Sequence, residues 1–380
     1  MIKVANLLEE AKVGGPQRRV VFAASKMLDQ VSTTIVTSFE NSNDFEILCQ
    51  QAGIPFKKIR ITRLTKEIKP LLRYIFFSAF EIFAAARYFR NSDFDIVHVN
   101  GSQQFKGVLI AKLGGKKVIW HLTDTWMPKI ILKVFSMLSF MADGWIYSSE
   151  RSKAYYQPLI KSNKKGFLIP APVDTNFVSK NVTIDEFSFT NDFLETDIII
   201  GTVANINPIK GIELFIKAAD QVSTSYSNVK FVILGPVSSN QESYFKELQK
   251  LCKSLDLKNI SFVGKHADVR PFLKKLDIYV CSSLSESSPL SVWEAMAMEL
   301  PIISTDVGDV GLYVENYING FVSKVGDINA MSNNIEYLLK NRELLDIYGK
   351  ESRRIAVQKL DVRVCADRHI RAYSETLRAP

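Results

Sequence analysis

Cysteine is scarce in this chain of 380 residues, which contains four: Cys49, Cys252, Cys281 and Cys365. They lie far apart and form no C-x-x-C pair, so the sequence lacks the ligand spacing of a zinc site and the motif of a thiol oxidoreductase. Few and widely spaced cysteines are typical of a protein whose thiols are free or buried in a reducing cytoplasm.

Long apolar runs are also missing. The most apolar stretch, residues 71–89, is interrupted by Arg73, Glu81 and Arg87, whereas a membrane-spanning helix needs about 20 mostly uncharged residues. The N-terminus lacks the apolar region of a signal peptide. We therefore expect a cytoplasmic protein that is soluble or peripheral on the inner face of the plasma membrane, and not an integral one.

Charge is present but unevenly divided. The chain has 48 basic and 40 acidic residues, a formal charge of +8. Residues 1–170 contain 25 basic and 13 acidic residues (+12), which leaves 23 and 27 (−4) for residues 171–380. A basic first half and a slightly acidic second half predict that the two halves meet different partners.

Short apolar segments alternate with helical patterns along the chain. We expect strands at 2–8, 33–37, 96–100, 117–121 and 144–148, then at 198–203, 230–234, 260–263, 278–281, 301–304 and 320–322. Apolar strands separated by helices indicate parallel strands covered on both faces. Because the chain is longer than one core normally serves, we predict an α/β fold with two doubly wound, Rossmann-like domains facing across a cleft.

The predicted domains are residues 1–180 and 181–360, joined by a polar, strand-poor segment near 170–193. Residues 361–380 are expected to form a helix that packs back towards the first domain. In such folds ligands bind beyond the carboxyl ends of the strands, so the loops that follow each strand are the places to search.

The first such loop contains Gly14, Gly15 and Pro16. Paired glycines allow close approach of a ligand, and a helix N-terminus offers free N–H groups. The loop matches neither G-x-G-x-x-G nor G-x-x-x-x-G-K-[ST], which argues against a dinucleotide fingerprint or a P-loop. A turn that needs glycine for its geometry alone stays an alternative.

A pair of carboxylates follows the strand expected at 278–281. Glu286 lies in the loop, Pro289 fits a first helical turn, and Glu294 lies inside the helix that follows. The N–H groups of Leu290 and Ser291 at the start of this helix suit an anion. Two carboxylates around an anion site match a sugar nucleotide, with the diphosphate on the helix end and hydroxyl groups on the acids. Two unrelated surface charges are the alternative.

The stretch from Glu286 to Glu294 resembles the E-x7-E motif of retaining glycosyltransferases of the GT-B fold, in particular glycosyltransferase family 4 (group 1). Its surroundings agree, with similar segments at 264–269, 276–280, 301–308 and 320–322. The similarity covers residues 201–348 well. In the first half it is thinner and rests on Gly14, Gly15 and His121.

The resemblance implies a role for each matching residue. Glu286 would contact a donor-sugar hydroxyl beside the reacting carbon, and His121 the sugar near its 6-position; a strand-end histidine satisfied within the protein is the alternative for His121. Lys210, before Gly211, would act as a third catalytic group by neutralising charge on the departing diphosphate. The implied donor-binding residues are Gly14, Gly15, Asn205, Lys210, Ser288, Pro289, Leu290, Ser291 and, on the ribose, Glu294.

Two departures from the family pattern stand out. Asn205 replaces an arginine that is usual five residues before the lysine, and a neutral amide binds phosphate less strongly. Ser287 replaces the customary glycine after the first glutamate, and Gly308 is followed by Asp309 in place of a second glycine. With these changes, an enzyme of weakened activity stays an alternative.

The resemblance also implies the reaction, a transfer with retention from a nucleotide-diphosphate sugar, which we expect to be a UDP-sugar. The expected acceptor is a hydroxyl of a lipid-linked saccharide in bacterial surface polysaccharide synthesis. The leaving phosphate would take the acceptor proton, and Asp124 is a candidate base. No cofactor or metal is expected, because Asp93 and Asp95 fit D-x-D but precede the strand at 96–100, at the wrong end for a ligand crevice.

A basic segment precedes the aromatic-rich stretch 75–83 in the first half. A basic cluster beside such a helix is typical of attachment to anionic lipid, and a buried helix behind a solvated loop is the alternative. Nucleic acid is not expected as a partner, since no RNA- or DNA-binding module is recognisable. The candidate membrane residues are Lys57, Lys58, Arg60, Arg63, Lys66, Lys69 and Arg73.

Other functions stay open on this fold. The sequence is compatible with a sugar-nucleotide epimerase or a sugar phosphorylase, both of which use the same two-domain architecture. It is also compatible with a non-catalytic partner that binds sugar nucleotides, an interpretation supported by Asn205 and Ser287.

Overall fold

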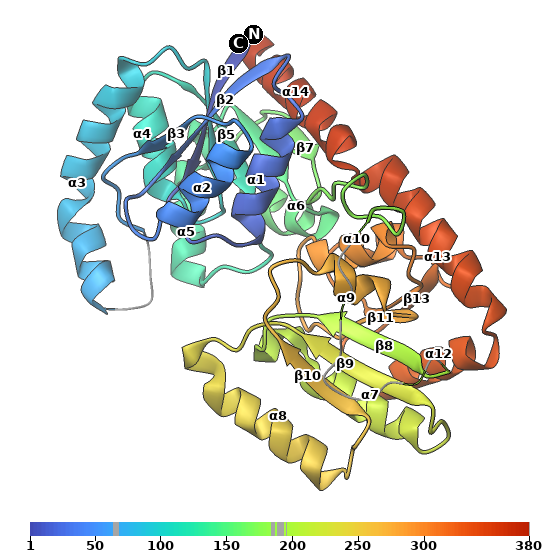
Figure 1. Cartoon of the computed structure of the whole chain (residues 1–380). Helices are drawn as coiled ribbons and strands as arrows, with labels where there is room; N and C mark the ends of the chain where they lie inside the picture. Colours follow the sequence, from blue (N-terminus) through green and yellow to red (C-terminus); the bar gives the residue numbers. More distant parts are fainter. Residues whose placement is uncertain (64–67, 184–186, 188–193, 195, 380) are drawn as a thin grey trace. The chain divides into compact units, whose positions relative to one another are not determined.

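The computed structural model describes residues 1–63, 68–183, 187, 194 and 196–379 (Figure 1). The chain divides into two compact units: unit 1 comprises residues 1–172 and 362–380, and unit 2 comprises residues 173–361. The borders therefore fall at 172/173 and 361/362, compared with 180/181 and 360/361 from the sequence. That the two domains face each other stays a prediction.

Unit 1 is built on a seven-stranded sheet with the order β3-β2-β1-β4-β5-β6-β7, in which all neighbouring strands are parallel. The order reverses direction between β1 and β4, which is the switch point of a doubly wound sheet. The strands are β1 (Ile2–Leu8), β2 (Val31–Thr37), β3 (Phe56–Lys58), β4 (Ile96–Asn100), β5 (Lys117–Leu122), β6 (Gly144–Tyr147) and β7 (Gly166–Leu168).

Two apolar cores cover the faces of this sheet. Successive residues of a strand point to opposite faces, so Val4 packs with α1, α2 and α14, whereas Ala5 packs with α3, α4, α5 and α6. The chain thus returns to unit 1 with its last helix. The helices are α1 (Gly15–Ser25), α2 (Asn43–Gln51), α3 (Ile68–Arg90), α4 (Phe105–Leu113), α5 (Lys129–Leu138), α6 (Glu150–Tyr156) and α14 (Val362–Arg378).

Unit 2 repeats this architecture on a six-stranded parallel sheet with the order β10-β9-β8-β11-β12-β13. Its switch point lies between β8 and β11. The strands are β8 (Ile198–Val203), β9 (Val229–Leu234), β10 (Ile260–Gly264), β11 (Ile278–Cys281), β12 (Ile302–Thr305) and β13 (Gly320–Ser323).

Helices lie between these strands and, as α12 and α13, after the last of them. Helices α7, α8 and α12 share one apolar core with the sheet. The helices are α7 (Ile212–Ser223), α8 (Glu242–Ser254), α9 (Arg270–Lys274), α10 (Leu290–Ala297), α11 (Val310–Tyr313), α12 (Ile328–Lys340) and α13 (Glu343–Ile355).

The two ends of unit 2 are paired with each other. Val173 forms a parallel bridge with Asp361, and its N–H donates to the Leu360 carbonyl oxygen at 3.0 Å. The Thr175 hydroxyl donates to the Asp361 carboxylate at 2.5 Å. The segments by which the chain enters and leaves unit 2 therefore lie side by side.

The predicted doubly wound α/β fold is confirmed. Among the described residues, no helix combines the length and apolar character needed to cross a membrane.

Candidate functional site

The sheet of unit 2 brings Lys210 and Glu286 together. Lys210 ends a short 3₁₀ turn after β8, and Glu286 lies in the loop after β11. Because β8 and β11 are neighbours at the switch point, their loops emerge side by side at the carboxyl edge. The Lys210 Nζ donates to Glu286 Oε1 at 2.5 Å, so the structure joins two of the residues singled out from the sequence.

Gly211 explains why this loop can approach so closely. Its φ is +59°, in the left-handed region, and a Cβ there would collide with the carbonyl oxygen of Ser282. The Ser282 hydroxyl in turn donates to the Lys210 carbonyl oxygen at 3.0 Å. Glycine after Lys210 is therefore required by the packing of one loop on the other.

The loop that carries Glu286 is also held by the next strand. Gly308, after β12, has a φ of +51°, and a Cβ there would collide with the Ser287 carbonyl oxygen. The N–H of Asp309 donates to that same oxygen at 3.2 Å, a backbone contact that does not depend on the aspartate side chain. Ser287 has no left-handed backbone, so this position does not require glycine for its backbone conformation.

The Glu286 carboxylate is fixed from two sides. Besides Lys210, the hydroxyl of Ser283 donates to its Oε1 at 2.8 Å, and only 15% of the Glu286 side chain is exposed. Burial and the charge of Glu286 raise the pKa of the Cys281 thiol beneath it. The site thus presents a positioned carboxylate, and the cysteine stays protonated.

Helix α10 starts beside this pair. Pro289 is the residue that caps the helix, and the helix begins at Leu290, one residue later than the predicted first turn. A proline side chain cannot accept a hydrogen bond, so the N–H groups of Leu290 and Ser291 have no side-chain cap. Such groups form an anion site. Glu294 is half-buried on the same helix.

Ser288 supports the start of this helix, since its Oγ accepts a hydrogen bond from the indole N–H of Trp293 at 3.1 Å. Asn205 lies exposed in the loop after β8, the same loop that carries Lys210. Unit 2 therefore contains seven of the nine residues predicted to bind the donor.

The other two, Gly14 and Gly15, belong to unit 1. Gly14 precedes α1 with an extended backbone, at φ −154°, and a Cβ added to Gly15 would meet no atom within 4 Å. Neither position needs glycine for packing within unit 1. The open space at Gly15 is compatible with the close ligand approach predicted from the sequence.

His121 lies at the end of β5 and is fully buried. Its Nδ1 hydrogen-bonds to His98 Nε2 at 3.0 Å, and its Nε2 lies 3.3 Å from Arg19 Nη1. Burial, and then the charge of Arg19, hold its pKa well below the ordinary value. With no exposed surface the ring offers a ligand no contact in this conformation, and the predicted sugar contact stays a prediction.

Asp93 and Asp95 precede β4, as expected. The Lys3 ammonium group pairs with Asp93 at 2.5 Å, and the Lys3 backbone N–H donates to the Asp95 carboxylate at 2.8 Å. The D-x-D pattern therefore holds the start of β1. Within the described part of the chain, no three His, Cys, Asp or Glu side chains are grouped as metal ligands.

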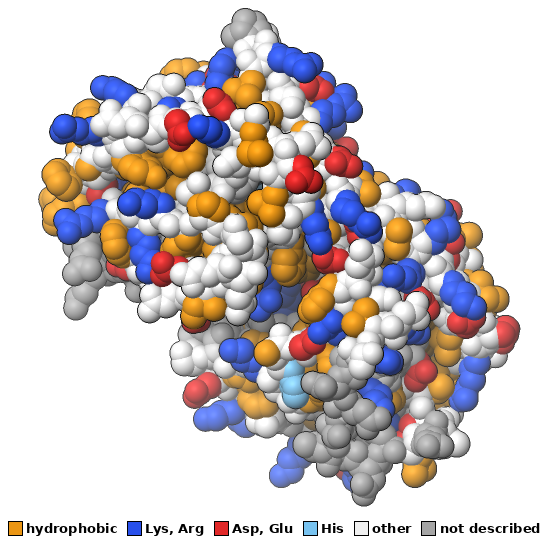
Figure 2. All heavy atoms as spheres, turned by 45° about the horizontal axis from the view of Figure 1, so that its top comes forward, with side chains coloured by type: hydrophobic (Ala, Val, Ile, Leu, Met, Phe, Trp, Pro, Cys, Tyr) orange, Lys and Arg blue, Asp and Glu red, His pale blue; other side chains and the backbone are white. Residues whose placement is uncertain are grey.

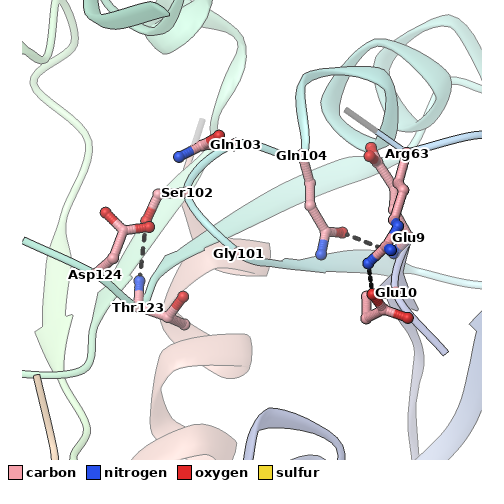
Figure 3. A pocket seen from close by; sticks show the side chains of 9 residues that line it. All are labelled: Glu9, Glu10, Arg63, Gly101, Ser102, Gln103, Gln104, Thr123 and Asp124. Carbon is pink, nitrogen blue, oxygen red and sulfur yellow. Dashed lines mark hydrogen bonds and ion pairs between the residues drawn. The ribbon is translucent and has the colours of Figure 1, made fainter. Parts of the chain in front are cut away.

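Unit 1 has a pocket that the sequence did not reveal (Figure 3), although one of its lining residues, Asp124, was a candidate base. It lies where β1, β4 and β5 end. Finding it from the sequence would require knowing that these three strands are neighbours. Its lining residues are Glu9, Glu10, Arg63, Gly101, Ser102, Gln103, Gln104, Thr123 and Asp124.

Comparison with known proteins agrees with this geometry. Residues 183–355 match the family model "Glycosyl transferases group 1". The chain is 29% identical to the putative glycosyltransferase EpsD of Bacillus subtilis over 171 residues, or 45% of this chain and 44% of that protein. It is 25% identical to trehalose synthase of Thermococcus litoralis over 227 residues, or 57% and 53%. The chain thus spans about half the length of these relatives.

The fold resembles solved structures over the whole chain. Anabaena Alr3699/HepE in complex with UDP-glucose superposes with a TM-score of 0.79 at 20% identity, covering 100% of both chains. A mutant of TarM from Staphylococcus aureus, in complex with UDP among other ligands, gives 0.75 at 15% identity, covering 98% of this chain and 100% of that chain.

Residues 183–355 of the chain are thus similar to the group 1 glycosyltransferases. The fold of the chain is the GT-B fold. The match to the group 1 model lies entirely within unit 2, the unit that contains Lys210, Glu286 and the start of α10.

Proposed function

We propose that the chain is a retaining glycosyltransferase that moves a sugar from a UDP-sugar to an acceptor hydroxyl. The observation that carries the proposal is the contact of Lys210 with Glu286 beside the uncapped start of α10. It places a cation, a carboxylate and free N–H groups at one switch point, where open α/β sheets bind their ligands.

The charges suit a diphosphate leaving group. A lysine ammonium group has three N–H donors, and Lys210 uses one on Glu286, which leaves two for phosphate oxygens. The N–H groups of Leu290 and Ser291 add uncharged donors. Such preorganised groups stabilise charge that develops in a transition state. Asn205 offers only an amide, so Lys210 carries more of this task than in relatives with an arginine.

The proposed reaction needs no further reactant. The acceptor oxygen bonds to the anomeric carbon on the face that the diphosphate leaves, the bond between that carbon and the phosphate oxygen breaks, and the leaving phosphate takes the acceptor proton. Glu286 accepts hydrogen bonds from sugar hydroxyls and Glu294 from the ribose. Charge neutralisation is assigned to Lys210 and the helix end, so the reaction is proposed to be metal-independent.

UDP is the proposed nucleotide because several structures of the same fold bind it. The HepE structures contain UDP or UDP-glucose, and a TarM structure contains UDP.

The test is a transfer assay with UDP-sugars and an acceptor panel, with the anomeric configuration of the product read by NMR. Glu286→Gln and Lys210→Met should each lower transfer roughly 100-fold, since removing one electrostatic group at such a site costs about 10²–10³ in rate. Lys217→Met, an exposed lysine on α7, is the control. Product with inverted configuration, loss of activity with chelator, or an epimer formed without acceptor would contradict the proposal.

We further propose that unit 1 meets a membrane surface on the cytoplasmic side, where the acceptor is a lipid-linked saccharide of bacterial surface polysaccharide synthesis. Helix α3 supports this proposal. Phe76, Phe77, Phe80 and Phe83 are 77%, 55%, 68% and 68% exposed, and their spacing places them on one face. Figure 2 has hydrophobic side chains along its left edge, where α3 lies in Figure 1.

The basic segment contributes less charge than the sequence indicated. Lys58 pairs with Glu46 at 2.8 Å and Arg63 pairs with Glu10, whereas Lys57 and Arg60 are exposed. Lys66 lies outside the described residues, as do the side chains of Lys69 and Arg73. The aromatic face of α3 is therefore the stronger support for lipid contact.

Flotation with vesicles tests the membrane proposal. The protein should float with phosphatidylglycerol/phosphatidylcholine vesicles and less with phosphatidylcholine alone, because the exposed lysine and arginine favour anionic lipid. Phe80→Ser/Phe83→Ser should release it, whereas Phe39→Ser, a 58% exposed phenylalanine after β2, should not. Equal flotation of both variants would reject the role of α3.

A further inference from the structure

The pocket of unit 1 lies at the switch point of its sheet. Glu9 and Glu10 follow β1, the segment from Gly101 to Gln104 follows β4, and Thr123 and Asp124 follow β5. Since β1 and β4 are adjacent and the strand order reverses between them, this is the place where a doubly wound sheet binds its ligand. The pocket is formed entirely by unit 1.

The size of the pocket restricts its occupant. Its cavity volume is about 220 Å³, below the roughly 300–1,000 Å³ of pockets that hold drug-sized ligands. A single sugar ring suits this volume better than a nucleotide does.

One wall presents a carboxylate in a fixed position. The hydroxyl of the buried Tyr156 donates to Asp124 Oδ1, and the Ser102 hydroxyl and the Trp126 N–H also hydrogen-bond to this carboxyl group. Ser102 is itself held by the N–H of Thr123, which donates to its Oγ at 3.0 Å. In Figure 3, Asp124, Ser102 and Thr123 form one side of the pocket.

The opposite wall is also polar. Glu10 pairs with Arg63 and accepts the N–H of Lys12 at 2.9 Å. The side-chain oxygen of Gln104 accepts the Glu9 N–H at 3.3 Å. Figure 3 places Gln104, Glu9, Glu10 and Arg63 together on this side, across from Asp124.

The charge of the lining selects against an anion. Its charged groups are the carboxylates of Glu10 and Asp124 and one cation, Arg63, which is already paired with Glu10. Burial raises the pKa of Glu9 to about 8, so this third carboxyl group is neutral. The rest of unit 1 is basic: unit 1 contains 29 lysines and arginines and 15 aspartates and glutamates. A phosphate would therefore bind elsewhere on unit 1, whereas hydroxyl groups match the carboxylate acceptors and the amides of Gln103 and Gln104.

We propose that this pocket binds an uncharged sugar ring of the acceptor, with Asp124 and Glu10 accepting hydrogen bonds from its hydroxyl groups. The inference rests on the proposed glycosyltransferase function and adds the class of group that enters the acceptor side. It also makes Asp124 the residue that positions the ring.

Saturation-transfer NMR with the full chain tests this proposal. The probes are octyl glycosides of glucose, galactose, N-acetylglucosamine and rhamnose, together with glucose 6-phosphate and galactose 6-phosphate. At least one neutral glycoside should bind, and the two sugar phosphates should bind more weakly than their neutral counterparts. Asp124→Asn and Glu10→Gln should each weaken that binding roughly 10-fold, the loss expected for one hydrogen bond to a charged group.

Asp29→Asn, an exposed aspartate of unit 1, is the matched control and should leave binding unchanged. Absence of binding by every neutral glycoside, stronger binding of the sugar phosphates, or equal binding by the pocket variants and the control would each overturn the proposal. A thermal shift of the wild-type protein with UDP tests the donor proposal separately: a shift with UDP but a failed glycoside test overturns the pocket alone.

Discussion

At the scale of single residues, unit 1 contains a buried ammonium group, that of Lys106, which hydrogen-bonds to two side chains. Lys106 Nζ lies 2.6 Å from Glu81 Oε2 and 2.7 Å from Thr62 Oγ1. Lys106 and Glu81 are 1% and 7% exposed. Glu81 belongs to α3 and Lys106 to α4, so the ion pair joins the aromatic-bearing helix to its neighbour.

Breaking this pair from one side should be costly. Lys106→Met leaves Glu81 buried without its cation, and removal of one partner of a buried pair costs about 3–5 kcal/mol. Urea unfolding should show this loss for Lys106→Met, and the double variant Lys106→Met/Glu81→Gln should recover part of it. Lys133→Met, at an exposed position of α5, should change little. Equal losses in the single and double variants would show that the charge pair is not the cause.

Glu9 makes stability depend on pH. Burial raises its pKa from 4.5 to about 8, against the opposing effects of the Lys106 charge and the Gly107 N–H. Between these values the folded state holds a proton that the unfolded state has lost, so stability falls as pH rises from about 5 to 8. Glu9→Gln removes this dependence and should melt a few degrees above wild type at pH 8 but not at pH 5.

The control for this prediction is Glu40→Gln, at an exposed position after β2, whose melting temperature should follow that of wild type at both pH values. A constant difference between Glu9→Gln and wild type across the pH range would refute the titration of Glu9.

At the scale of elements, two of the glycines singled out from the sequence, one in each unit, serve different purposes. Gly211 has a left-handed φ and is crowded by Ser282, whereas Gly15 faces open space. Gly211→Ala should therefore lower stability by at least about 1–3 kcal/mol, the cost of the strained backbone conformation before the collision with Ser282 is added. Gly15→Ala should leave stability within about 0.5 kcal/mol and weaken UDP-sugar binding, because the methyl group occupies the space offered to the ligand.

Calorimetric unfolding and titration with a UDP-sugar separate these effects. If Gly15→Ala binds the donor like wild type, Gly15 is only a turn residue, which is the alternative that the sequence left open.

The elements that sequence patterns predicted are those with strong local signals. Apolar segments such as 96–100, 198–203 and 278–281 coincide with β4, β8 and β11. The three-residue edge strands β3 and β7 were not predicted, because they are too short for a periodic pattern. The sequence of the aromatic stretch 75–83 was compatible with both a lipid-contacting helix and a buried helix. Only the packing of α3 reveals which of its residues are exposed.

The site follows the same rule. Glu286 and Lys210 were predicted because motif and spacing are local, and their contact follows from the adjacency of β8 and β11. The pocket of unit 1 combines residues from Glu9 to Asp124, over a span of more than one hundred positions. No single stretch of sequence signals it.

At the scale of the whole molecule, each unit should respond to its own ligand. UDP at about 100 times its Kd adds roughly 2.7 kcal/mol of stability, which for a unit of this size corresponds to about 5–10 °C. The shift should affect unit 2, whose buried reporter is Trp293, and not unit 1, which contains the buried Trp120 and Trp145. Scanning calorimetry with tryptophan emission, with Trp293→Phe to assign the signal, measures it.

Lys210→Met should remove this shift while the transition of unit 1 stays in place. A shift with UDP that follows only the unit 1 tryptophans would contradict the assignment of the donor site to unit 2.

The pairing of Val173 with Asp361 has a consequence for how such a chain can change. Unit 2 is one uninterrupted stretch whose entrance and exit adjoin, joined in register by backbone and side-chain hydrogen bonds. A continuous segment of that kind can be exchanged between homologues as one piece, because only its two adjacent ends have to match the rest of the chain. Under the proposed function, such an exchange would replace the donor-binding unit while unit 1, α14 included, remains as it is.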